Sequence, residues 1–490
     1  MPQLSRYSFN ICEILLLIVL SLLTTNYLAP KFLNADVILN SIMSVQNITL
    51  FYWGQNRLLN VLPALTWIFS DPGLNLYACL VVTAMSFFSL LWLWSYLISN
   101  TYFDSQSFND INKKIVRLNI FLLLVLTFFN FFNEDTLFEI IIGHIEYSLA
   151  YLILTVAFYL TLNIRQAYRF LIFLILIILC TGINNSIVVP SLAFIFFYLI
   201  LRRDFKFTEA LILFFCTICA FLIWAKIATL YLESPTAYSQ FSLNGLSDAI
   251  KTSVKNLTDR ILATQLIFIL LLGLLIKLYL DTHSNTHLSK KIIASTEWTK
   301  PLLIFCVTWT GVFAANNWVA ANGYHFRYFI PVIFACCICF ALYLNNTLLS
   351  FGTAVNKVVL CSTTGYLIFF LSHPFIPLKN YPVFNISNFQ EFQNVSGFAG
   401  DYWLAWPAVM RKLMEGQESF GFSYRGVSNT TNINNVFTSR YKNSTPFYIG
   451  CIKISTNQCF EDMKKILPMS TLLTQQQLNK DASIIKLKFQ

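Results

Sequence analysis

Long and nearly uninterrupted runs of apolar residues recur along the chain, and they restrict its fold more than any other feature. A helix of about 20 apolar residues crosses the roughly 30 Å hydrocarbon core of a bilayer. We therefore expect an all-α polytopic membrane protein with about eleven transmembrane helices. The runs lie near residues 11–23, 75–98, 116–133, 147–163, 170–183, 186–201, 208–230, 261–280, 301–315, 327–344 and 357–372.

Composition agrees with a membrane-embedded chain. Hydrophobic residues make up 56% of the sequence and charged residues 11%, and the mean hydropathy is +0.61. Soluble domains carry about 25% charged residues. The formal net charge is +10, but no basic helix or aromatic-basic strand typical of a nucleic-acid module occurs. We expect a bilayer, and no nucleic acid, among the partners.

Lys and Arg cluster in alternate loops, which predicts the orientation because short cytoplasmic loops carry the positive charge. The first apolar run is expected to be an uncleaved helix, since no small-residue cleavage site follows it. The basic loops lie near residues 113–117, 165–169, 202–206, 290–300 and 357. The expected outer segments are 29–74, 134–146, 231–260, 316–326 and the tail.

The last part of the chain loses the apolar runs and alternates instead, as in residues 483–489. Alternation is typical of a strand with one buried face. We predict a transmembrane domain over residues 1–372 and a small α+β extracytoplasmic domain over 373–490. Cys451 and Cys459 are spaced for a local disulfide in an oxidising compartment.

The first outer loop holds the strongest candidate for acid–base chemistry. Asp36 follows the first helix, and the segment FYWGQNR at residues 51–57 brings Trp53, Gln55 and Arg57 together. Carboxylate, amide and guanidinium groups beside a membrane suit the polar head of a lipid. The aromatic residues also suit an interfacial belt.

The second outer loop is acidic. Glu134, Asp135, Glu139 and Glu146 occur there with His144, and the loop itself has no Lys or Arg. Like charges this close either bind a cation or raise one another's pKa. A divalent cation is therefore possible here, and the catalytic base could come from Glu134 or Asp135 instead of the first loop.

A later outer loop ends at a basic residue. Arg327 opens the next apolar run and follows Asn322, Tyr324 and His325. An Arg at this place can extend its charged end to the membrane surface. Together with its neighbours it also suits a phosphate clamp, because Arg binds phosphate through two nitrogen atoms.

Three segments resemble those of uncharacterised bacterial polytopic proteins of the GT-C class of membrane glycosyltransferases. They are FYWGQNR at 51–57, NGYHFRY at 322–328 and GDYWLAWP at 400–407. The order of loops, spans and tail is also similar over nearly the whole chain. We assign substrate binding to residues of these loops: Trp53, Gln55, Arg57, His144, Asn322, Tyr324, His325, Arg327 and Asp401.

The resemblance implies a bacterial inner-membrane enzyme with a sugar donor on a polyprenyl phosphate and an envelope glycan or lipid acceptor outside the cytoplasm. It also implies a first-loop carboxylate as base, which here is Asp36. Several family members have a second carboxylate beside it, whereas Asp36 lies between Ala35 and Val37, so metal use stays open. Arg57 or Arg327 could stabilise the leaving phosphate, and single displacement would invert the anomeric centre.

Other functions fit parts of this pattern. A transporter or flippase of a lipid-linked sugar would usually show internal repeats and ionisable residues at mid-membrane, and the centres of these spans contain few. A polysaccharide polymerase or ligase would use the outer Arg residues without a base at Asp36. A non-enzymatic assembly scaffold would need neither.

Overall fold

The computed structural model divides the chain into two compact units. The first contains Met1–Thr24, Ala84–Ala225 and Thr236–His373, and the second contains Thr25–Thr83, Lys226–Pro235 and Pro374–Gln490. The structure describes residues 11–53, 59–103, 110–164, 168–201, 207–230, 242–260, 302, 305–339, 353–386, 389–422, 446–467, 470–479 and 481–489.

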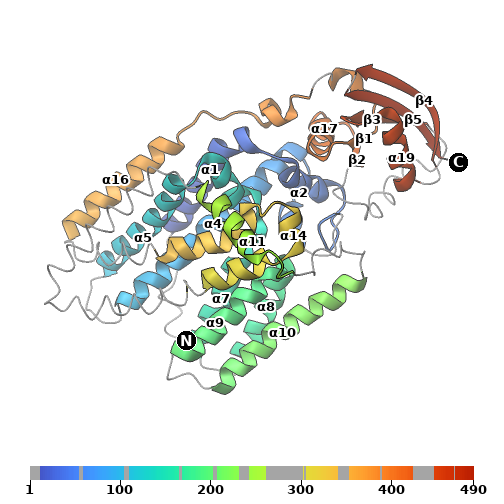
Figure 1. The fold of residues 1–490 in the computed structure, drawn as a ribbon. Coiled ribbons are helices and arrows are strands. Elements are labelled where there is room, and N and C mark those ends of the chain that lie inside the picture. Colours follow the sequence, from blue (N-terminus) through green and yellow to red (C-terminus); the bar gives the residue numbers. More distant parts are fainter. Residues whose placement is uncertain are drawn as a thin grey trace. The chain divides into compact units, whose positions relative to one another are not determined.

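Among these residues, five helices are long and apolar enough to cross a membrane, which confirms the expected membrane protein. They are α1 (Ile11–Phe32), α4 (Pro72–Phe103), α5 (Asp110–Phe131), α7 (Ile145–Asn163) and α10 (Phe207–Leu230) (Figure 1). Shorter apolar helices include α8 (Arg169–Ile183), α9 (Val188–Leu201) and part of α16 (Thr353–Leu371). The predicted span at 261–280 lies outside the described residues, so the total of about eleven stays a prediction.

Aromatic side chains form the core of the first unit. Phe128 of α5 lies edge-on to Phe87 of α4, with ring centroids 5.1 Å apart. Phe334, from the helix Phe326–Cys339, contacts Phe128 at 6.1 Å and Tyr151 of α7 at 5.7 Å. Edge-to-face pairs of this kind add to the burial of apolar area. Four helices are thereby joined around one ring cluster.

The loop regions contain short helical elements that hold several candidate residues. Two of them, α6 (Glu134–Phe138) and the π-helical turn η2 (Glu139–Gly143), lie between α5 and α7. The others in the first unit are α11 (Leu246–Thr258), α14 (Asn317–Ala321) and the turns η3 (Asn185–Ile187) and η5 (Phe326–Phe329). The tail begins with turns η6 (Leu378–Asn380), η7 (Pro382–Phe384) and η8 (Phe389–Phe392).

A buried amide fixes α2 (Ala35–Gln46) in the second unit. Asn75 accepts a hydrogen bond of 2.8 Å from Ser41 and donates one of 2.9 Å to the hydroxyl of Ser44, both on α2. It also donates to the carbonyl of Thr66 at the end of α3 (Val61–Thr66). A buried polar group with its partners made specifies one arrangement of the elements around it. The orientation of α2 is set by these bonds.

The tail forms a five-stranded sheet with the order β2-β1-β3-β5-β4. Its strands are β1 (Gly397–Gly400), β2 (Phe420–Gly421), β3 (Phe447–Ile452), β4 (Ser470–Asn479) and β5 (Ala482–Phe489). β1 runs parallel to β2 and β3, whereas β3, β5 and β4 are antiparallel. Two helices, α17 (Tyr402–Met414) and α19 (Thr456–Ile466), belong to the same domain. The described part of the tail is thus helices and a small sheet, as the alternation predicts.

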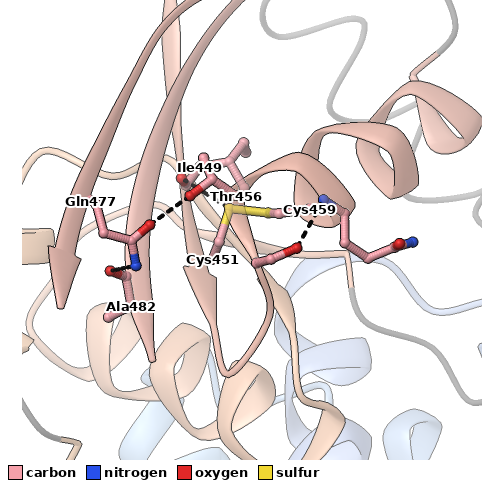
Figure 2. Close-up of a disulfide and its surroundings, with 8 residues drawn as sticks. Ile449, Cys451, Thr456, Cys459, Gln477 and Ala482 are labelled. Carbon is pink, nitrogen blue, oxygen red and sulfur yellow. Dashed lines mark hydrogen bonds between the residues drawn. A yellow bond between two sulfur atoms is a disulfide. The ribbon is translucent and has the colours of Figure 1, made fainter. Parts of the chain in front are cut away.

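A disulfide joins Cys451 of β3 to Cys459 of α19, which confirms the predicted pairing. Figure 2 shows the bond beside the hydrogen bond from Thr456 to Gln477, which ties the start of α19 to β4. Both cysteines are fully buried. The bridge therefore fastens α19 to the sheet.

Candidate functional site

Side-chain caps fix the starts of the two helices that carry the first candidate carboxylate and the aromatic segment at 400–407. The amide oxygen of Asn34 accepts a hydrogen bond from the backbone of Val37 and caps α2, which places Asp36 in the first turn. At α17, the Asp401 carboxylate accepts from the backbone of Trp403 at 2.8 Å. Each cap satisfies a free N–H group at a helix start. Asp401 therefore has a capping role, and its part in substrate binding stays a prediction.

The turn before α17 requires glycine. Gly400 has a φ of 106°, and a Cβ atom there would overlap the carbonyl oxygen of Ile452 on the neighbouring strand. Only glycine adopts this conformation at low cost. The backbone thus goes directly from β1 into α17 and makes Tyr402 the first residue of the helix.

Two tyrosines hold Asp36. The Tyr402 hydroxyl donates a hydrogen bond of 2.7 Å to Oδ1 of Asp36, and the Tyr52 hydroxyl donates one of 3.1 Å to its backbone carbonyl. The two hydroxyl oxygens are 3.5 Å apart. Burial and the nearby Tyr52 and Asp36 raise the pKa of Tyr402 well above its ordinary value. Tyr402 therefore keeps its proton and remains a donor.

Trp53 is buried beside these groups. It is 5% exposed, and its ring lies 6.2 Å from that of Trp406 on α17. Trp53 is therefore packed inside the protein and is not an exposed residue of an interfacial belt. Gln55 and Arg57 lie outside the described residues. Phe51 and Leu59, which come before and after them in the sequence, form an antiparallel bridge. We call Asp36, Tyr52, Trp53, Tyr402 and Trp406 the first-loop site.

The acidic second loop has cationic partners, contrary to what the loop sequence suggests. Asn133 caps α6, so Glu134 and Asp135 occupy its first turn. Oδ2 of Asp135 lies 2.6 Å from Nη1 of Arg260, whose guanidinium also lies over the ring of Phe326 at 4.8 Å. Asp135 is engaged in this ion pair before any ligand arrives.

His144 lies between two carboxylates. Nε2 is 2.7 Å from Glu139, and Nδ1 is 2.9 Å from Glu146 in the first turn of α7. Burial would lower the pKa of His144, but the charges and hydrogen bonds of Glu146 and Glu139 outweigh it and raise this pKa to about 10. Burial would likewise raise the pKa of Glu139, yet the bond and charge of His144 make the net shift downward. The expected mutual raising of carboxyl pKa values is therefore wrong at Glu139, because His144 carries the opposing charge.

The segment at 322–328 is held in an uncommon backbone conformation. Gly323 and Tyr324 have φ values of 62° and 53°, and the amide of Asn256 on α11 donates to both of their carbonyls at 2.9 Å. A positive φ at tyrosine costs energy and occurs most often at functional sites. Asn322 donates locally to the carbonyl of Trp318.

His325 and Arg327 follow directly. Nδ1 of His325 accepts a long hydrogen bond, 3.4 Å, from the backbone N–H of Arg327. Burial and the charge of Arg327 lower the pKa of His325 to about 4, so its ring is neutral with a proton on Nε2. The Arg327 guanidinium donates to the Tyr328 hydroxyl at 3.0 Å.

The charge of Arg327 acts on Glu139, and the charges of Arg327 and Arg260 act on His325, so these groups form one electrostatic cluster in the first unit. We call it the second-loop cluster, consisting of Asp135, Glu139, His144, Glu146, Arg260, His325 and Arg327. Its mixture of guanidinium groups, a neutral imidazole and carboxylates suits an anionic ligand with polar substituents. Over the described ranges, no group of three or more His, Cys, Asp or Glu side chains could hold a metal ion, so the divalent cation stays a prediction.

The sequence did not indicate several residues at or beside these sites, among them Tyr402, Asn256 and Arg260. Tyr402 belongs to the segment at 400–407, in which the predicted site residue was the neighbouring Asp401. Asn256 and Arg260 lie in a different loop from their partners, and 125 positions separate Arg260 from Asp135. No local pattern could have indicated them.

No protein-family model matches the sequence, and no curated protein or solved structure is significantly similar to it.

Proposed function

We propose that the protein is a membrane glycosyltransferase that moves a sugar from a polyprenyl-phosphate-linked donor to an acceptor outside the cytoplasm, with Asp36 as the base. The observation that carries this proposal is the 2.7 Å hydrogen bond between Tyr402 and Asp36. It joins the candidate carboxylate to the segment at 400–407, and Trp53 packs on Trp406 of the same segment. Two of the three segments that resemble GT-C enzymes therefore meet at Asp36, one at its carboxylate and the other at its backbone carbonyl.

The reaction follows from the chemistry of these groups. The acceptor oxygen attacks the anomeric carbon and forms the new C–O bond, while the bond from that carbon to the phosphate oxygen breaks. Asp36 takes the hydroxyl proton, and the lipid phosphate leaves with the electron pair. A positioned base contributes about 10² to 10⁴-fold to such a step.

The second-loop cluster supports the phosphate part of the proposal. Arg327 supplies a guanidinium group and neutral His325 supplies an N–H donor from the loop that contains the third resembling segment. Arg260, just after α11, supplies a second guanidinium group. Arg binds phosphate oxygens with two parallel hydrogen bonds. We assign the lipid phosphate to Arg327 and its neighbours, with Arg57 as an additional cation.

Two features support the proposed membrane location and the side on which the tail lies. Five apolar helices suit a donor that lies in the bilayer. The disulfide in the tail suits an oxidising space, so we assign the tail to the extracytoplasmic side of the plasma membrane.

Mass spectrometry of envelope glycans tests the function. Cells that lack the gene should lose a sugar substituent, and the wild-type chain should restore it, whereas Asp36→Asn should not. Asp71→Asn is the matched control, because Asp71 caps α4 through the backbone of Leu74 and asparagine can do the same. Full restoration by Asp36→Asn would refute Asp36 as the base. An unchanged glycan profile without the gene would refute the transferase.

A further inference from the structure

We propose that Tyr402, from the C-terminal domain, is a positioning residue that holds the Asp36 carboxylate in the orientation of a base. This inference rests on the proposed function of Asp36. Tyr402 is assigned no contact with the donor or the acceptor and acts through Asp36.

The two tyrosines donate their hydrogen bonds to different atoms of Asp36. Each hydroxyl has one proton, and Tyr402 directs its proton to the side-chain Oδ1 of Asp36 while Tyr52 directs its own to the backbone carbonyl. Their 3.5 Å contact is therefore a secondary one. Tyr402 acts on the carboxylate, and Tyr52 acts on the turn of helix that carries it.

The helix that carries Tyr402, α17, is rigidly held. The residue begins α17 directly after Gly400, and Asp401 caps the helix. One turn later, Trp406 is fully buried. A hydroxyl on a capped helix anchored in a core keeps its place better than one on a free loop.

The chemical consequence follows from the direction of donation. A hydrogen bond donated to one carboxylate oxygen fixes the rotation of the group, and a base that is held in one orientation is ready to accept the proton of an acceptor hydroxyl. Charged groups on the adjoining segments are Lys31 in the last turn of α1 and Asp401 before α17. Replacement of Tyr402 by phenylalanine removes the hydrogen bond and leaves both of them unchanged.

A double-mutant cycle tests the inference. In right-side-out membrane vesicles supplied with increasing amounts of lipid-linked sugar, Tyr402→Phe should lower the maximal rate of sugar transfer roughly tenfold and leave the dependence on donor concentration unchanged, because Tyr402 acts through Asp36. The double variant Tyr402→Phe with Asp36→Asn should be no slower than Asp36→Asn alone, since the side chain that Tyr402 positions is then already inactive. Tyr52→Phe, the matched control, should lower the rate less, because Tyr52 donates to the backbone carbonyl of Asp36 and not to its carboxylate.

A full rate in Tyr402→Phe, with the Cys451–Cys459 bridge intact as evidence of a folded tail, would overturn the inference. Additive losses in the double variant would also overturn it, because Tyr402 would then act independently of Asp36. An equal loss in Tyr402→Phe and Tyr52→Phe would overturn it as well, because the effect would then be general to the pair of tyrosines. A fully active Asp36→Asn variant would refute the proposed base itself, whatever the rate of Tyr402→Phe.

Discussion

Arg260, just after α11, and Asp135, in the first turn of α6, form an ion pair of 2.6 Å. The pair neutralises one of the two carboxylates that compete with Asp36 for the role of base. Because Asp135 is half exposed, with a side-chain relative exposure of 50%, the pair is expected to stabilise the fold by less than about 1 kcal/mol.

Asp135→Asn should therefore retain sugar transfer and lower the free energy of unfolding only slightly. Envelope-glycan analysis measures the first effect, and thermal unfolding in detergent measures the second. Glu134→Gln, in the same turn, is the companion variant. Loss of transfer in either variant, at normal expression and with an active Asp36→Asn, would move the base to the second loop.

Arg327→Ala should differ in kind from Asp36→Asn. A phosphate clamp acts in the ground state and in the transition state, so loss of Arg327 should weaken donor binding and also reduce the rate, by roughly a hundredfold or more. Asp36→Asn should reduce the rate alone. Transfer in membrane vesicles with increasing amounts of extracted lipid-linked sugar separates the two effects.

Arg327→Lys is the control for charge. Lysine keeps the positive charge and loses the paired nitrogen geometry, so it should restore part of the activity. Normal donor dependence in Arg327→Ala would remove the phosphate from this residue.

His144 should make the stability of the protein decline in alkali. Its pKa is raised from 6.5 to about 10 in the folded protein, so the folded state binds the proton more tightly than the unfolded state. The resulting stabilisation is fully present below about pH 6.5 and is lost as the pH rises toward about 10. Thermal unfolding across this range should show the decline, and His144→Gln should remove most of it.

His325 offers the opposite control. Its pKa is lowered from 6.5 to about 4, so protonation destabilises the folded state and stability falls as the pH drops from about 6.5 to about 4. His325→Gln should remove that acid-side decline and leave the alkaline one. A reversed assignment of the two pH windows would contradict the charge states given for the cluster.

Gly400→Ala should destabilise the tail much more than Gly416→Ala. Both glycines have positive φ, 106° and 76°, but a Cβ atom at 400 overlaps the carbonyl of Ile452 whereas one at 416 has nothing within 4 Å. An alanine at 416 should cost about 1 kcal/mol, and one at 400 roughly 2 to 3 kcal/mol. Chemical denaturation of the two full-length variants, compared side by side, measures the difference. Equal losses would mean that the backbone shifts freely at this turn.

The tail should contain the Cys451–Cys459 bridge in purified protein and face the non-cytoplasmic side. Non-reducing peptide mapping should find the linked pair, and closure of so short a loop is expected to contribute about 2 to 3 kcal/mol. Reporter fusions should place residues 99–115 and 281–300 inside the cell and the C-terminus outside. A cytoplasmic C-terminus would remove Tyr402 from any extracytoplasmic site.

The apolar runs predicted helices well because hydrocarbon imposes a minimum length on a span. They predicted the residues at which the helices end less well. α1 continues through buried Thr24 and Thr25 to Phe32, since polar residues inside the protein extend a helix beyond its apolar run. The run near 170–183 gives α8, which Asn184 ends after 15 residues.

The two sites differ in how far the sequence could lead to them. Asp36 and the second-loop carboxylates were visible because acidic residues are scarce here, and the disulfide was visible because its cysteines are close in sequence. The partners that decide the chemistry of these carboxylates could not be seen in the sequence, because Tyr402 lies 366 positions from Asp36 and Arg260 comes from a separate loop. Hydrogen bonds between such distant segments depend on packing that no local pattern encodes.

The Tyr402–Asp36 hydrogen bond also orders events during synthesis. Ribosomes make the chain from its N-terminus, so α2 is synthesised long before residue 402 exists. A nascent chain that has completed all of its apolar runs still lacks the hydroxyl that orients Asp36, and the amide of Gln46 at the end of α2 still awaits the carbonyl of Ser419. The candidate base therefore reaches its final geometry only after the tail has emerged and folded, which keeps unfinished chains from presenting an assembled site.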